Sequence, residues 1–501
     1  MIQEIVFPHK DPQQRRKGVE QFTCRLLVAL TLLLALLLAL VGNIRAAPPT
    51  LRWAVPKRIP GYPAGTESPY LVADHNRVVH AFHSQPVSGT VSIVYSQWDY
   101  EQGWTMPVDV LSAPRGEALV KGVWLDTKGI FHLIFAGGDE SGGDIYYSRA
   151  PALGAGQARA WSKPKLIGKD ANMFAAAMAS DDRGDLFVFY GGKSDGDGLY
   201  EVYSRDGGDN WSEPVSIFLT DDEGMVPGSV SLLLDRASNL HITWSVWRPP
   251  FGAIDIYYAR LNANSKETTI PVLLDSGGAD TPVIIDYKDS LLLVYATSGI
   301  AQGVAGKAMR QSFDGGRSWT KATWAFPPLV GGNGGAALVR DSSNNLYALL
   351  GNRTGDCCHG LWYSAWEGNR WSEPQAIVQG PKTLYLDPFS PQAVVSQGNI
   401  ILATWWNESK IDGVWYTYAK LDVPELPLTR LPTPVPSPTA TAIIPTDVPP
   451  TVKPLPAKLP ANLVPEDAPS PLDQSPNVAI FLGVFPALAL VAITVLLRKR
   501  H

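Results

Sequence analysis

One short pattern recurs along this chain and constrains its fold more than any other feature. It consists of a tryptophan, a proline three residues later, and an aliphatic residue three further on. Five copies are intact, beginning at Trp53, Trp104, Trp161, Trp211 and Trp371. Two more keep the frame but lose one residue, beginning at Thr268 and Trp319. Successive copies start 51, 57, 50, 57, 51 and 52 residues apart. A near-constant period of this length indicates a repeat architecture.

A second marker shows what each repeat contains. An aromatic–small pair such as Tyr147-Ser148, Tyr203-Ser204 or Tyr258-Ala259 precedes most of the tryptophan copies. Short apolar runs such as 130–135 and 240–244 follow polar turns. Each unit therefore holds about four short β-runs separated by Gly, Asp and Asn turns. Four strands repeated every ~50 residues predict an all-β fold, a β-propeller.

The order of the markers predicts how the ring closes. The last Tyr-Ala strand, at Tyr418, has no tryptophan copy after it, and the first copy, at Trp53, has no tyrosine strand before it. We therefore expect the N-terminal strand to complete the last blade as a clasp, which removes exposed sheet edges. The count predicts a seven-bladed propeller over residues 48–423, with six blades as the alternative.

Composition supports one body with unlike ends. All 16 Trp lie between Trp53 and Trp415, while 16 of the 53 residues from Pro424 to Pro476 are proline. A net charge of −5 shows no basic excess, so a nucleic-acid partner is not expected. Three cysteines are too few to staple a chain of 501 residues, so the core must be hydrophobic.

The two ends predict export and membrane attachment. Residues 1–47 combine a basic start with an apolar run of 17 residues, which is typical of a signal peptide or a signal anchor. Residues 424–476 would form an extended Pro/Thr-rich linker. Residues 477–497 are long and apolar enough for a transmembrane helix, and the basic residues 498–501 would stay cytoplasmic. We therefore expect a single-pass protein of the cell membrane with the propeller on the extracellular side.

Two segments carry the pattern Ser-x-Asp-x-Gly-x-x-Trp between the tyrosine and tryptophan strands. They are Ser204, Asp206, Gly208 and Trp211, and Ser312, Asp314, Gly316 and Trp319. The aspartate can accept backbone N–H groups within a turn, and glycine permits a positive φ. This pattern resembles the Asp box, or BNR repeat, of sialidase-like propellers. The resemblance implies that these residues are structural elements of the outer rim.

The same resemblance raises the question of catalysis. Sialidases use three arginines, a tyrosine nucleophile with a glutamate partner, and an aspartate acid/base. Their Arg-Ile-Pro motif is matched by Arg58-Ile59-Pro60. The repeat frame, however, places Arg58 in the clasp strand, where it would be a rim cation. Because no other triad member can be assigned, whether the chain is an enzyme stays open, and its catalytic residues are unknown.

Loops between the second and third strands of each blade should gather on one face, here called the channel face, where propeller ligands usually bind. Tryptophans can stack on apolar sugar faces while charged groups bond to hydroxyls. Candidate binding residues are Trp247, Arg248, Arg353, Asp356, Trp406 and Glu408. The alternative is that Trp247 and Trp406 only fill the ring. The sequence thus favours a surface protein that binds a glycan or a protein partner, with a sialidase-like exo-glycosidase as the alternative.

Three further features are candidate sites. Cys357 and Cys358 are adjacent and could form a vicinal disulfide or remain thiols. The Gly- and Asp-rich loops 137–144 and 191–198 could bind Ca²⁺, but their spacing matches no full calcium loop. Histidines 80, 132 and 241 recur at equivalent strand positions, which favours packing over metal ligation. We therefore predict no cofactor and no metal site, with calcium as the one alternative.

Overall fold

The computed structural model describes residues 50–139, 142–181, 183–220, 224–301, 304–331, 333–352, 359–380, 388–407 and 413–429. From Arg52 onward they belong to one compact unit. Regular structure here is β-strand, apart from three single-turn 3₁₀ helices, η1 (Ala152–Gly154), η2 (Ala158–Ala160) and η3 (Pro327–Leu329). Within these ranges no helix is long and apolar enough to span a bilayer. The predicted signal segment, residues 430–476 of the predicted linker and the predicted C-terminal span lie outside the described residues.

The strands form six antiparallel sheets, five with four or five strands and one with seven. The first sheet contains β2 (Tyr70–Ala73), β3 (Val78–Val87), β4 (Thr90–Asp99), β5 (Gly103–Trp104) and β6 (Val108–Leu111). The seven-stranded sheet contains β7 (Glu117–Leu125), β8 (Ile130–Asp139), β9 (Gly142–Pro151), β10 (Lys165–Ser180), β11 (Leu186–Gly192), β12 (Gly198–Ser204) and β13 (Val215–Leu219).

The other four sheets follow in chain order. They are β14 (Val226–Leu234), β15 (Asn239–Trp247), β16 (Ala253–Asn262) and β17 (Val272–Asp275); β18 (Asp280–Tyr287), β19 (Ser290–Ala301), β20 (Val304–Ser312) and β21 (Thr323–Trp324); β22 (Asn333–Arg340), β23 (Leu346–Asn352), β24 (His359–Ala365) and β25 (Gln375–Gly380); and β26 (Pro388–Ser396), β27 (Ile400–Asn407) and β28 (Trp415–Lys420) with β1 (Lys57–Arg58).

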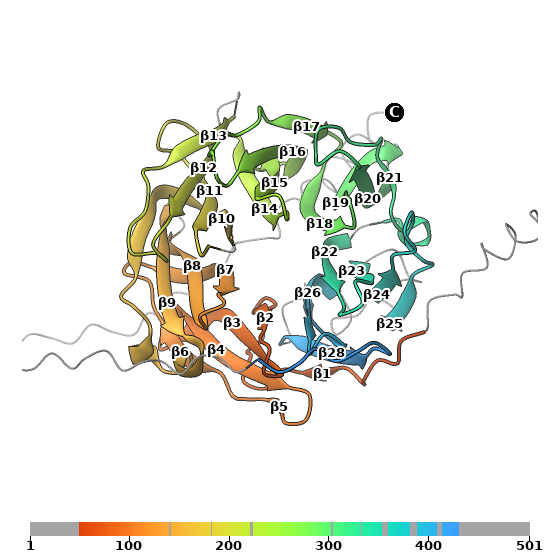
Figure 1. The fold of residues 1–501 in the computed structure, drawn as a ribbon, viewed down its shortest axis with the longest axis horizontal. Helices are drawn as coiled ribbons and strands as arrows, with labels where there is room; N and C mark the ends of the chain where they lie inside the picture. The colour runs from red at the N-terminus through yellow and green to blue at the C-terminus, as the bar shows by residue number, and fades with distance from the viewer. Residues whose placement is uncertain are drawn as a thin grey trace, which may run out of the picture. The chain divides into compact units, whose positions relative to one another are not determined.

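The sheets are arranged around a common axis (Figure 1). The strands nearest the axis touch in succession, in the order β2, β7, β10, β14, β18, β22 and β26, and β26 returns to β2. Strand β10 serves two four-stranded units, since Lys165–Ala171 pair with β9 and Ala171–Ser180 pair with β11. The predicted all-β propeller fold is therefore confirmed.

The N-terminal strand closes the ring. Strand β1 pairs antiparallel with β28, with Lys57 opposite Tyr416 and Arg58 opposite Trp415. The Ile59 N–H then donates to the Val414 carbonyl at 2.8 Å. The N-terminal segment thus supplies the outer strand that the last sheet lacks, as the order of the sequence markers predicts.

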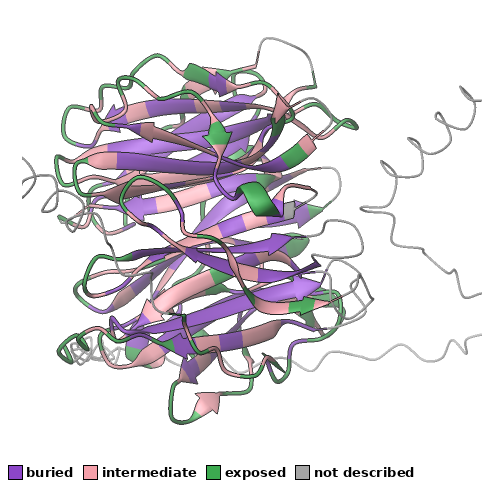
Figure 2. Cartoon of the chain, turned by 90° about the vertical axis from the view of Figure 1, so that its right-hand side faces the viewer, coloured by how far each residue is buried: buried purple, intermediate pink, exposed green. Residues whose placement is uncertain are grey.

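The core lies between neighbouring sheets. Alternate residues of each strand face one neighbour or the other, so the strand centres are buried while turns on both faces are exposed (Figure 2). Phe187 and Phe189 of β11, for example, pack in one cluster with Ile242 and Trp244 of β15. The channel face is the face at which β3, β8, β11, β15, β19, β23 and β27 end. The opposite face, which carries the Asp boxes, is called the Asp-box face.

Candidate functional site

Trp247 and Arg248 lie where the sequence places them, at the channel-face end of β15. The Trp247 indole Nε1–H lies 3.2 Å from Asp280 Oδ1, at the start of the inner strand β18, and 3.2 Å from Ser245 Oγ. The indole therefore bridges two neighbouring sheets. Arg248 is exposed beside Asp255, whose pKa burial raises while the Arg248 charge opposes that shift.

A polar cluster extends from this bridge into the next sheet. Asp280 Oδ1 also accepts the Thr281 N–H at 2.7 Å. The Lys307 ammonium, on a residue only 2% exposed, donates to Thr281 Oγ1 at 3.2 Å. Burial lowers the pKa of Lys307 to about 7, although the Asp280 carboxylate opposes this shift. A buried lysine whose pKa lies near 7 is typical of functional sites. No sequence pattern predicts that Lys307 is such a residue.

Two large aromatic side chains are exposed at the same face. Phe251, in the loop after β15, is 81% exposed, and Phe174, in the β10 segment that begins β10's pairing with β11, is 67% exposed. The Asn172 side chain donates to the Pro227 carbonyl at 2.9 Å, which ties this part of β10 to the start of β14. Two adjacent sheets thus each present an exposed apolar ring at the channel face.

Trp406 occupies a different environment from Trp247. It is 6% exposed and packs in an apolar cluster with Ile59, Tyr62 and Val414. Its ring centroid is 5.2 Å from that of Phe389, edge to face. Its faces are therefore covered by the clasp and the last sheet, as in the alternative that it fills the ring. Arg353, Asp356, Cys357, Cys358 and Glu408 lie outside the described residues.

Two titratable residues on the inner strands, Tyr70 and Lys121, have shifted pKa values that no sequence pattern predicts. Burial, reinforced by the Glu67 charge, raises the pKa of Tyr70 to about 12, although Tyr70 is 36% exposed. Burial lowers the pKa of Lys121 to about 8, and Glu67 opposes that shift. Lys121 occupies a bulge of β7, between Val120 and Gly122, and this bulge breaks the alternation that a sequence pattern would use.

Arg58 lies far from any such arrangement. It belongs to β1, the outermost strand of the last sheet, and its guanidinium lies 5.5 Å from the Trp415 ring centroid. This position matches the rim cation predicted from the repeat frame.

The Asp boxes form turns that contact the preceding four-stranded unit. Ser204 Oγ donates to Asp206 Oδ1 at 2.8 Å and accepts the Gly208 N–H at 2.9 Å. Asp206 also accepts the Asn210 N–H at 2.8 Å, and these hydrogen bonds lower its pKa to about 2. Asp314 repeats the arrangement, accepting from Ser312 at 2.9 Å and from the Ser318 N–H at 2.9 Å. The carboxylate oxygens of both aspartates accept hydrogen bonds within their own turns, which fits a structural role.

Each box docks on the sheet unit before it. Tyr147 donates to the Gly207 carbonyl at 3.0 Å, and Arg149 donates to the same oxygen at 2.5 Å. Arg260 likewise donates to the Gly315 carbonyl at 3.0 Å. The Trp211 ring lies 5.1 Å from that of Tyr147, and the Trp319 ring 5.1 Å from that of Tyr258. The box tryptophans therefore pack across the unit boundary.

The recurring histidines complete these contacts. His132 Nδ1 lies 2.7 Å from the Tyr147 hydroxyl and its Nε2 3.4 Å from Asp126 Oδ2. Equivalent Asp–His–Tyr chains run through His80 and His241. These three histidines therefore pack within their units, as their recurrence in the sequence predicts. Over the described ranges, no group of three or more His, Cys, Asp or Glu side chains is placed to hold a metal ion.

Comparison with known proteins shows a similarity of fold. No family model matches the sequence, and no curated protein matches it. An ulvan lyase of polysaccharide lyase family PL25, solved bound to -[GlcA(1-4)Rha3S]-, is 13% identical with a TM-score of 0.50, over 76% of this chain and 98% of that chain. The BP39L lectin from Burkholderia pseudomallei is 13% identical with a TM-score of 0.52, over 73% and 99%.

The NanB sialidase from Streptococcus pneumoniae is 11% identical with a TM-score of 0.41, over 77% of this chain and 72% of that chain. The similarity to the ulvan lyase and the lectin supports the β-propeller fold that the Asp-box resemblance implies.

Proposed function

We propose that this protein binds a saccharide at its channel face. The observation that carries the proposal is that two exposed rings, Phe174 and Phe251, share the channel face with the hydrogen bond between Trp247 and Asp280. Aromatic rings stack on the apolar faces of sugars, while carboxylate and indole groups fix the hydroxyls. The lectin, and the ulvan lyase solved with -[GlcA(1-4)Rha3S]- bound, support the idea that this fold suits such ligands.

The test is a glycan array probed with the full-length protein and its variants. Phe251→Ala and Phe174→Ala should each weaken binding about five- to tenfold, because each removes a stacking surface. The matched control is Phe313→Ala, which removes a ring that is 69% exposed within an Asp box on the other face. Equal losses in all three variants, or no glycan binding by the parent protein, would sink the proposal.

A second candidate is an exo-acting glycoside hydrolase. The observation that favours it is Tyr70 beside Glu67 on the inner wall, the residue types of the sialidase nucleophile and its partner. Because the pKa of Tyr70 is raised to about 12, the phenol is neutral at rest, and Glu67 would have to accept its proton. Fluorophore release from a sialoside, lost in Tyr70→Phe, would support this activity; no release would exclude it for sialosides.

We also propose the finer points of the architecture. Counting the two four-stranded units that share β10 separately gives seven blades. The ring would stand outside the cell, exported by residues 1–47 and held by the span at 477–497. Protease added to intact cells should then cleave in 424–476 and release the ring; a ring that stays protected would contradict this topology.

A further inference from the structure

The chain does not leave the ring where its last strand ends. After β28, residues 421–429, here called the strap, stay bound to the ring. The Leu421 N–H donates to the Asn399 carbonyl at 2.7 Å, and the Leu426 N–H donates to the Gln397 carbonyl at 2.8 Å. Both carbonyls belong to the turn between β26 and β27, so the strap binds a turn of its own sheet.

The strap also contacts the sheets on either side of the last one. The Ser342 hydroxyl, in the turn between β22 and β23, donates to the Pro424 carbonyl at 2.5 Å. On the other side, the Thr429 N–H donates to the His75 carbonyl at 3.1 Å, in the turn between β2 and β3. All three turns lie on the Asp-box face, because β3, β23 and β27 end at the channel face. One short segment thus joins three neighbouring sheets, including the two that meet where the ring closes.

An ion pair and a close contact accompany these hydrogen bonds. Arg77 Nη2 of the first sheet lies 2.7 Å from Glu425 Oε1 of the strap. Gly398 has φ of 76°, and a Cβ there would lie 2.6 Å from Leu426 Cγ and 2.8 Å from Ser342 Cβ. A glycine is therefore required both by the backbone conformation and by the approach of the strap and the neighbouring turn.

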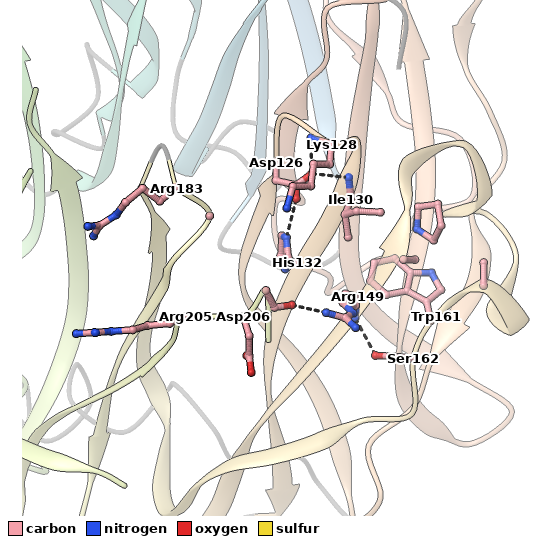
Figure 3. Close-up of a pocket in the computed structure, with 15 residues that line it drawn as sticks. Asp126, Lys128, Ile130, His132, Arg149, Trp161, Ser162, Arg183, Arg205 and Asp206 are labelled. Atoms are coloured by element: carbon pink, nitrogen blue, oxygen red, sulfur yellow. Dashed lines mark hydrogen bonds and ion pairs between the residues drawn. The ribbon is translucent and has the colours of Figure 1, made fainter. Parts of the chain in front are cut away.

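The turns on which the strap lies are held by their own aspartates. Asp74 Oδ1 accepts the N–H groups of Asn76 and Val78 at 2.7 and 2.9 Å, and Asp341 Oδ1 accepts two N–H groups after β22. Figure 3 shows the equivalent turn between β7 and β8, where Asp126 accepts two backbone N–H groups in the same way. Since that turn forms at a sheet that the strap does not reach, the strap binds turns whose shape does not depend on it.

We infer that the strap is a second closure of the ring, separate from the β1 clasp. The clasp pairs with β28 at the outer edge of the last sheet, whereas the strap joins the turns that follow the innermost strands β22, β26 and β2. Because the strap includes the first residues of the predicted linker, the linker leaves the ring at the Asp-box face, opposite the channel face. The inference depends neither on a sugar at the channel face nor on the predicted membrane span.

The test is hydrogen exchange of the full-length protein, measured at the Leu426 and Thr429 amides. Gly398→Ala should speed their exchange about tenfold or more, because the added methyl group displaces the strap. The matched control is Gly184→Ala, in the corresponding turn between β10 and β11, where φ is 86° and no atom lies within 4 Å of the added carbon. Both variants carry similar backbone strain, so Gly398→Ala should melt about 2 °C or more below Gly184→Ala.

The ion pair separates the strap from the turn beneath it. Arg77→Glu and Glu425→Arg each place two like charges together and should each speed exchange of the strap about threefold. The double variant Arg77→Glu/Glu425→Arg restores an opposite pair and should restore the protection.

Three results would each overturn the inference. Strap amides that exchange in the parent protein at the rate of unprotected amides would show that the strap is not bound in solution. Equal exchange and equal Tm in the two glycine variants would show that the strap adds nothing to closure. A double charge variant that exchanges as fast as the single ones would show that Arg77 and Glu425 do not meet.

Discussion

At the scale of single residues, the glycine of each Asp box is required by a close approach. Gly208 has φ of 92°, and a Cβ there would lie 2.2 Å from the Tyr147 hydroxyl. Gly316 has φ of 84° and meets the Tyr258 hydroxyl in the same way. Both the backbone conformation and the neighbouring tyrosine therefore exclude a side chain.

We predict that Gly208→Ala lowers the free energy of unfolding by about 3 kcal/mol or more, because it adds a clash to the positive-φ strain. Gly89→Ala is the matched control, since Gly89 has φ of 88° and no atom within 4 Å of the added carbon. That variant should lose only about 1 kcal/mol. Denaturant unfolding measures both; equal losses would show that the tyrosine contact adds nothing.

Asp206 predicts a pH dependence of stability. Its folded pKa, about 2, lies below the ordinary value because its turn donates hydrogen bonds to the carboxylate. A lowered pKa gives stability that is present above the unfolded value near 4 and is lost as pH falls toward 2.

Asp206→Asn should therefore lower Tm at pH 6 by more than at pH 2.5. Thermal melts across this range measure the difference. Asp289→Asn, in the exposed turn between β18 and β19, serves as the control and should show a smaller change with pH. A penalty in Asp206→Asn that is the same at both pH values would contradict the assigned role.

At the scale of elements, the sheet units are joined by the Asp–His–Tyr chains. Tyr147 of β9 receives support from His132 within its own unit and donates to the next unit at Gly207. The sequence showed that the histidines recur but not what they contact, because each has an aspartate partner six residues before it and a tyrosine partner fifteen or seventeen residues after it in the chain.

We predict that Tyr147→Phe lowers the free energy of unfolding by about 1–3 kcal/mol, because it leaves His132 Nδ1 without its partner and removes one of the two hydrogen bonds to the Gly207 carbonyl. Tyr95→Phe is the matched control. The Tyr95 hydroxyl lies 2.6 Å from His80 Nδ1 and accepts from Gln97 at 2.6 Å, so both partners belong to its own sheet, and no Asp box follows in the next unit. The excess loss in Tyr147→Phe measures the bond between units; an equal loss would mean that this bond contributes nothing.

At the scale of the whole molecule, the ring is held shut by a short clasp. Strand β1 has only two residues, and both are exposed, so its pairing depends on the buried Ile59 that follows. Ile59 is 2% exposed and packs with Trp406 and Val414.

Ile59→Lys should open this closure, because a lysine charge in an apolar cluster costs several kcal/mol. We expect Tm to fall by about 5 °C or more and the exposed edge of β28 to promote association, visible by size-exclusion chromatography. Lys57→Ala, on the exposed strand, should change neither property. A monomeric Ile59→Lys variant with the parent Tm would show that the clasp is dispensable.

The sequence by itself determined the all-β repeat, the strand that closes the ring, the Asp boxes and the position of Trp247. These follow from local rules, since period, turn residues and strand alternation are written in consecutive residues. Only the tertiary structure decided which groups meet across units. Trp406 is covered by Ile59 of the clasp segment, and Lys307 is buried beside Thr281 of another strand in its own sheet. Burial and charge pairing are set by those neighbours, so no local pattern encodes them.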